Sequence, residues 1–195
     1  MTSIVLIPWA QTDWGESGRL ATRTPLPLNE TGARQAVAWA NALAGRELAA
    51  VYCGEEPNAR ETAKVLAERA EVRLKEISGL EEIDVGLWEG LTAEQVESRF
   101  PKLYKRWVED PVSVCPPHGE PVGQACERVV EAVLRITRKH KGATVGIVLG
   151  PIALAATRSH LEHGRPDRLH QLKADQPIWY RIADGRAERV PAGIG

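Results

Sequence analysis

Short apolar runs alternate along this chain with amphipathic stretches, and this order restricts the fold more than any other feature. The runs that predict buried strands are rich in aliphatic and β-branched residues and lie at 3–7, 49–52 and 144–149. The stretches that predict helices carry apolar residues at helical spacing and lie at about 30–43, 57–70, 122–140 and 151–162. The order predicts an α/β protein with three layers, α/β/α, around a mostly parallel sheet.

Shorter signals complete the expected element order. Residues 72–77 alternate in polarity and predict a third strand. Thr92 and Gln95 have the spacing of a capping box, which predicts a short helix to about residue 99, and Pro101 begins another helix. Near the C-terminus, strands at 178–183 and 187–190 flank Asp184-Gly185, a favourable hairpin turn. No repeat or linker divides the chain, so we expect a single domain over residues 1–195.

Charge and composition exclude several function classes. The chain has 25 Lys and Arg against 26 Asp and Glu, a net charge of −1, so it lacks the basic face typical of a nucleic-acid binder. No apolar run approaches the roughly 18–20 residues that span a bilayer, and no basic segment precedes the first apolar run, so neither a membrane span nor a signal peptide is expected.

The cysteines predict a cellular location and do not have the pattern of a metal site. Cys53, Cys115 and Cys126 are odd in number and lack the spacing of metal ligands, which favours free thiols in a reducing cytoplasm. Cys53 precedes a predicted helix start, where a thiol pKa can be lowered, so a reactive role for it stays open. We expect no metal and no cofactor.

Four stretches resemble the histidine phosphatase superfamily, the group that is similar to phosphoglycerate mutase. They are similar to its helix start, its strand-to-helix segment, its L-x-E-x-x-x-G-x-W-E-G element and its proline-rich insert, and they lie at 25–36, 52–68, 80–92 and 100–120. The resemblance implies a chemistry in which a His attacks a phosphoryl group, a second His and two Arg hold the phosphate oxygens, and a Glu or Asp protonates the leaving oxygen. Imidazole supplies the nucleophile, guanidinium groups bind the spread negative charge, and a carboxylic acid supplies the proton.

The position of the expected nucleophile carries different residues. Where the family has Arg-His-Gly after the first strand, this chain has Pro8-Trp9-Ala10. Thr12 and Trp14 still match the residues that follow, which supports the alignment. Trp9 has an indole N–H but no basic lone pair, and therefore cannot attack phosphorus.

The other expected site positions have also lost their positive charge. The Arg of the second motif falls on Asn58, and the second His falls on Gly150. Glu82 alone matches a catalytic position of the family, that of the proton donor. Arg60 lies two positions after Asn58 on the same predicted helix and points away from it, so it does not replace the missing Arg.

These losses predict a catalytically inactive protein, a pseudoenzyme that binds or regulates through an altered, uncharged pocket. An enzyme with rebuilt chemistry is the alternative: Glu82 would act as a general base, helped by His118 at the pocket rim. A conventional phosphatase or phosphoglycerate mutase is the least supported interpretation. The partner is a small molecule or another protein, and a homodimer stays open.

Two site positions have two interpretations each. Trp9 either fills the pocket by packing against apolar neighbours or forms a stacking platform for a ligand. Glu82 either holds a loop by hydrogen bonds or belongs to a new binding site. The start of the helix at Gly150-Pro151 keeps the N–H groups that attract anions, so residual anion binding there stays open.

Overall fold

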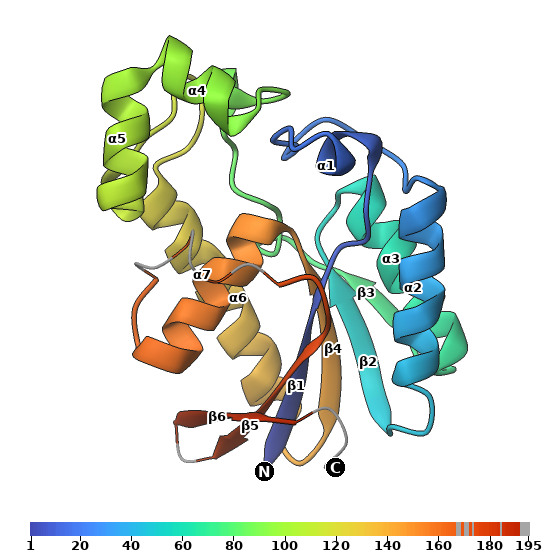
Figure 1. Ribbon diagram of the computed structural model, residues 1–195. Helices are drawn as coiled ribbons and strands as arrows, with labels where there is room; N and C mark the ends of the chain where they lie inside the picture. The colour runs from blue at the N-terminus through green and yellow to red at the C-terminus, as the bar shows by residue number, and fades with distance from the viewer. Residues whose placement is uncertain (167–168, 170–171, 173, 184, 192–195) are drawn as a thin grey trace.

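A central strand organises the molecule. The computed structural model describes residues 1–166, 169, 172, 174–183 and 185–191. Strand β1 lies between β4 and β5 in a sheet of six strands with the order β3-β2-β4-β1-β5-β6 (Figure 1). The strands are β1 (Thr2–Pro8), β2 (Leu48–Cys53), β3 (Leu74–Glu76), β4 (Thr144–Leu149), β5 (Ile178–Ala183) and β6 (Arg186–Val190). The first four are parallel, whereas β5 and β6 add an antiparallel hairpin at one edge.

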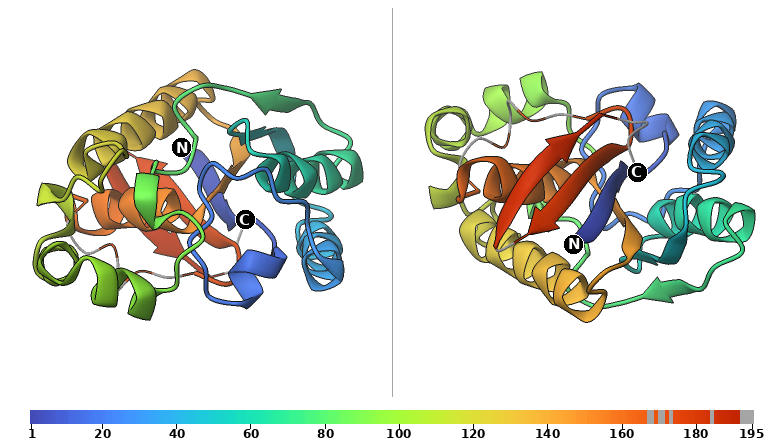
Figure 2. Two further views of the ribbon diagram at one scale, coloured as in Figure 1. Left: turned by 90° about the horizontal axis from the view of Figure 1, so that it is seen from above. Right: turned by 90° about the horizontal axis from the view of Figure 1, so that it is seen from below.

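Helices cover both faces of this sheet, as the alternating pattern predicted (Figures 1 and 2). On one face lie α2 (Glu30–Ala42) and α3 (Pro57–Arg69), and on the other lie α6 (Val122–Lys139) and α7 (Pro151–His163). Successive residues of β1 point to opposite faces, so Ile4 and Leu6 pack in the core with α6 and α7 while Val5 and Ile7 pack with α2 and α3. The predicted three-layer α/β/α fold is confirmed.

An insert between β3 and α6 forms a third apolar cluster above the sheet. It contains η1 (Gly86–Trp88), α4 (Ala93–Arg99), α5 (Pro101–Glu109) and η2 (Pro111–Ser113). Trp88 is buried in its centre, where its ring meets Trp107 edge-to-face at 5.9 Å and Phe100 at 6.5 Å. The predicted capping box is present at α4, because Thr92 and Gln95 each accept the other's backbone N–H.

The structure differs from the predicted elements in a few places. β3 begins at Leu74 rather than 72, because Glu71 adopts a left-handed φ of 55° and the Val72 N–H donates to Ala67 O at the end of α3. A short helix, α1 (Asp13–Glu16), was not predicted, since a single turn shows no periodicity. The hairpin of β5 and β6 is present, with Asp184 of its turn lying outside the described residues.

No helix in the described part of the chain is long and apolar enough to cross a membrane.

Candidate active site

The predicted site positions gather where two parallel strands end. Pro8 pairs with Leu149, and the Trp9 N–H donates to Leu149 O at 2.9 Å, so β1 and β4 finish side by side. Gly150 follows directly and is the N-cap of α7. Because open α/β sheets bind ligands at the carboxyl ends of their strands, this edge is the expected place for a site.

Gly150 has no room for a side chain. A Cβ atom added to it would overlap the Oε2 atom of Glu82 and would lie 2.8 Å from Cη2 of Trp9. The φ angle of Gly150 is −70°, which any residue can adopt, so the restriction is one of space and not of backbone conformation. The ring of Trp9 and the carboxylate of Glu82 therefore close together over this position. Trp9 is half-buried and also packs against the apolar core between the sheet and helices α2 and α3.

Glu82 is completely buried and hydrogen-bonded to the start of α7. Its Oε1 accepts the N–H groups of Ile83 at 2.7 Å and Ala153 at 2.9 Å, and its Oε2 accepts that of Ile152 at 2.7 Å. Burial raises the pKa of Glu82 to about 7, although the three N–H donors act in the opposite direction.

Hydrogen bonds at the start of α7 argue against the open possibility that it binds an external anion. The N–H groups of Ile152 and Ala153 already donate to Glu82, so the chain's own carboxylate occupies the position where an anion would bind.

A buried threonine joins the end of β1 to α3. Thr62 Oγ1 accepts the Ala10 N–H at 2.9 Å and donates to Asn58 O at 2.7 Å. Ala10, Asn58 and Thr62 are all buried. Thr12 has a local role in addition, because its Oγ1 accepts the Gly15 N–H and so caps α1. These contacts fix the backbone at the site positions without bringing a charged side chain to them.

Comparison with known proteins agrees with the fold and with the earlier resemblance. The model of the histidine phosphatase superfamily (branch 1) matches residues 4–188. The chain belongs to the histidine phosphatase superfamily.

Several known proteins are similar over most of this chain. A bifunctional protein of Mycobacterium tuberculosis is 36% identical over 148 residues, which are 75% of this chain but only 40% of that protein. Phosphoserine phosphatase 1 of Hydrogenobacter thermophilus is 28% identical over 156 residues, covering 80% of this chain and 74% of the relative. The solved structure of YhfR from Bacillus stearothermophilus aligns with a TM-score of 0.89 at 25% identity, covering 100% of this chain and 98% of that one. The chain thus spans about two fifths of the length of some curated relatives.

Glu56 contacts this site, although no pattern in the sequence predicted this contact. Its Oε1 accepts the Glu82 N–H at 2.5 Å, and burial raises its pKa. Its place directly before α3, at the N-cap position, was visible in the sequence, but nothing in the sequence linked it to Glu82. A second carboxylate therefore lies beside the first.

The remaining candidates lie apart from this centre. His118 is exposed, in a loop where it has a left-handed φ of 62°. No hydrogen bond joins it to Glu82 in the part of the chain that the structure describes. Arg60 pairs with Glu76 at 2.6 Å on the surface and does not stand in for the missing arginine.

The open possibility of a reactive Cys53 is corrected by the structure. Cys53 is fully buried, and burial, together with the nearby Glu76 and Glu56, raises the pKa of its thiol to about 12. Among the described residues, no group of three or more His, Cys, Asp or Glu is placed to hold a metal.

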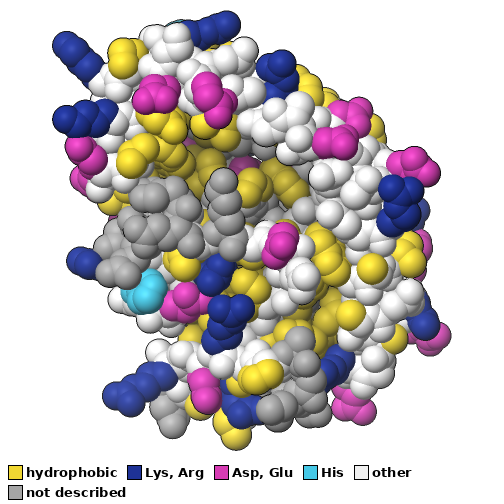
Figure 3. All heavy atoms as spheres, viewed as in Figure 1, with side chains coloured by type: hydrophobic (Ala, Val, Ile, Leu, Met, Phe, Trp, Pro, Cys, Tyr) yellow, Lys and Arg dark blue, Asp and Glu magenta, His cyan; other side chains and the backbone are white. Residues whose placement is uncertain are grey.

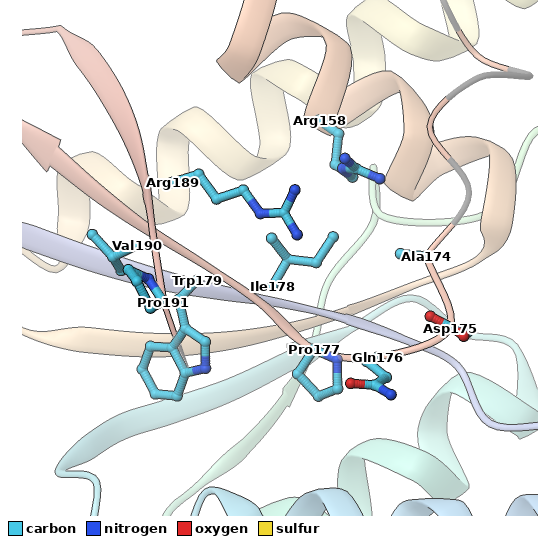
Figure 4. Close-up of a pocket in the computed structure, with 10 residues that line it drawn as sticks. All are labelled: Arg158, Ala174, Asp175, Gln176, Pro177, Ile178, Trp179, Arg189, Val190 and Pro191. Carbon is cyan, nitrogen blue, oxygen red and sulfur yellow. The ribbon is translucent and has the colours of Figure 1, made fainter. Parts of the chain in front are cut away.

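A separate cavity of about 500 Å³ lies beside β5 and β6 (Figure 4). Arg158 of α7 and Arg189 of β6 extend over Ile178 there. Arg158 pairs with Glu162 at 3.3 Å and donates to Leu172 O at 3.0 Å, so its charge is already balanced. None of the predicted site positions is among the described residues that line this cavity.

Proposed function

We propose that this protein has the histidine phosphatase fold but does not transfer phosphoryl groups, and that it acts by binding a small molecule or another protein. One observation carries the proposal: Trp9 and Glu82 fill the space at Gly150, so that the place of the second histidine cannot hold a side chain. The resemblance puts the nucleophile at Trp9 itself, and an indole ring has no lone pair with which to attack phosphorus.

Phosphate binding at these positions is weakened further by charge. Each lost charge-assisted hydrogen bond removes roughly 1.5–3 kcal/mol of stabilisation. With Pro8, Trp9, Asn58 and Gly150 in place of two Arg and two His, the affinity for phosphate falls by several powers of ten. The carboxyl group of Glu82 lies beside this space, and its ionised form repels an anion.

Glu82 is poorly placed to act as an acid or base. Its side chain has no exposed surface, and three backbone N–H groups occupy its two oxygens. A general base needs hydrogen-bond contact with substrate or with a reacting water. These contacts support a structural role for Glu82 and weaken the alternative in which it is the centre of a rebuilt hydrolase with His118.

The competing proposal is a conventional phosphatase, since several relatives are named as phosphatases. Incubation with p-nitrophenyl phosphate, phosphoserine and 3-phosphoglycerate separates the two. We expect phosphate release at the rate of the buffer alone and no acid-labile phosphoprotein. Turnover that Glu82→Gln abolishes would contradict the proposal, with Glu81→Gln as the matched control for loss of a neighbouring carboxylate.

A further inference from the structure

The cavity beside β5 and β6 has the size and the openness of a small-molecule site. It measures about 500 Å³ and lies between α7, the segment before β5 and the end of β6 (Figure 4). Ile178 and Trp179 form a buried part of its lining, whereas Asp175, Gln176 and Arg189 are exposed. The cavity is therefore reachable from solvent.

A hydrogen-bond network holds Arg158 of α7 in the wall of this cavity. Its guanidinium donates to Glu162 Oε1 at 3.3 Å and to Leu172 O at 3.0 Å, and the Tyr180 hydroxyl donates to the same carboxylate oxygen. The side chains of Arg158 and Glu162 are only 9% and 19% exposed. Glu162 thus balances one positive charge of the wall and fixes its position.

Arg189 of β6 brings a second positive charge to the same wall. It lies opposite Tyr180 in the β5–β6 hairpin, so its side chain is on the face of the sheet that α7 covers. Figure 4 shows it extending over Ile178 toward Arg158, with Asp175 apart from both. Within the described residues, the guanidinium of Arg189 takes part in no ion pair or hydrogen bond. One positive charge of the wall is therefore left without a counter-ion.

The remaining wall is mainly apolar. The apolar residues that line the cavity include Ala174, Pro177, Ile178, Val190 and Pro191. On the face shown in Figure 3, Lys and Arg side chains lie next to hydrophobic ones over α7 and β5. A carboxylate matches the fork of N–H donors on a guanidinium, and an apolar group attached to it would be removed from water against this wall.

We propose that this cavity binds an organic carboxylate, with the carboxylate group at Arg189 and an apolar group against the wall beside it. A single guanidinium without a counter-ion suits one negative charge better than the charge of about two that a phosphate ester carries at neutral pH. The inference goes beyond the proposed function, because none of the predicted site positions is among the described residues that line the cavity. Binding here is measured without turnover, so the two proposals fail separately.

Calorimetric titration and ¹H–¹⁵N spectra of the full chain test this site with three probes. Hexanoate carries both groups, hexanamide has the same carbon chain without the charge, and inorganic phosphate is an anion without an apolar group. We expect hexanoate to shift the backbone amide resonances of β5 and β6 to saturation. Hexanamide and phosphate should bind roughly tenfold more weakly, or less, since each lacks one of the two interactions.

A pair of arginine variants completes the experiment. Arg189→Gln removes the unbalanced charge and should weaken hexanoate binding by roughly tenfold or more. Arg186→Gln is the matched control: Arg186 is exposed on the same strand and is not among the described residues that line the cavity, so binding should be unchanged. The proposal is overturned if hexanoate leaves the β5 and β6 resonances unmoved, if hexanamide or phosphate binds as tightly as hexanoate, or if Arg189→Gln weakens binding no more than Arg186→Gln.

Discussion

Gly150 lies where the ring of Trp9 and the carboxylate of Glu82 meet, and the absence of its side chain lets them do so. At the scale of single residues, the side chains that fit at positions 9 and 150 therefore depend on each other. A histidine at 150 and a tryptophan at 9 cannot occupy this space together. A histidine at 150 would therefore also require a different side chain at position 9.

Substitution of Gly150 by Ala tests this packing. We expect the added methyl group to lower the free energy of unfolding by about 1–3 kcal/mol, because it overlaps Glu82 and crowds Trp9. Gly15→Ala is the matched control: its Cβ would lie 3.5 Å from the nearest atom, Thr12 Oγ1, and its effect should be within about 1 kcal/mol. Urea unfolding measures both, and equal effects would show that Gly150 is not tightly packed.

At the scale of elements, α2 illustrates how a helix end holds the site loop. Asn29 is the N-cap, and its Oδ1 accepts the Gly32 N–H at 2.8 Å. The same residue donates its backbone N–H to Gln11 O at 3.0 Å, beside the end of β1. Gly32 approaches the Gln11 backbone so closely that a Cβ atom there would overlap it. The start of α2 and the loop after Trp9 are thus packed as one unit.

Loss of this cap should weaken the helix start. Asn29→Ala is expected to lower the free energy of unfolding by about 1 kcal/mol, since it removes a side-chain acceptor for the first turn. Glu30→Ala is the control, because Glu30 is highly exposed and its ion pair with Arg34 contributes only a few tenths of a kcal/mol. The comparison is made by chemical denaturation; a larger loss in Glu30→Ala would contradict the assignment of the cap.

At the scale of the whole molecule, stability depends on the protonation of a carboxyl group at its centre. The pKa of Glu82 is raised from an ordinary value of 4.5 to about 7 in the folded protein. Between these pH values the folded state binds more protons than the unfolded chain, so the free energy of unfolding falls as pH rises. The raised pKa of Glu82 adds roughly 3 kcal/mol at most to the free energy of unfolding at low pH, relative to high pH. This addition is lost progressively as the pH rises to about 7, and above that pH the free energy of unfolding no longer changes with the ionisation of Glu82.

The variant Glu82→Gln isolates this contribution. It does not titrate at position 82, so the stability of the unmodified protein relative to the variant should decrease between pH 5 and pH 7 and level off above. Urea unfolding of both proteins at pH 5, 6, 7 and 8 measures the difference, in which other titrating groups such as Glu89 largely cancel. A difference that stays constant over this range would show that Glu82 ionises normally.

Local patterns in the sequence predicted most of the secondary structure of this protein. Apolar runs and helical spacing predicted the strands and helices, because these patterns depend on residues only a few positions apart. The residue types at 8–10, 58 and 150 already excluded a histidine nucleophile and its cationic partners there, since this depends on side-chain chemistry alone.

Only the tertiary structure decided which hydrogen-bond partners the buried polar side chains have. Glu82 accepts hydrogen bonds from Ile152 and Ala153, about seventy positions further along the chain, and Thr62 joins Ala10 to α3 across more than fifty. Such pairs meet because the strand order puts β4 between β2 and β1, and no local pattern encodes that distance. The sequence therefore determined which side chains stand at these positions. Only the packed structure decided that Trp9 and Glu82 fill the space at Gly150.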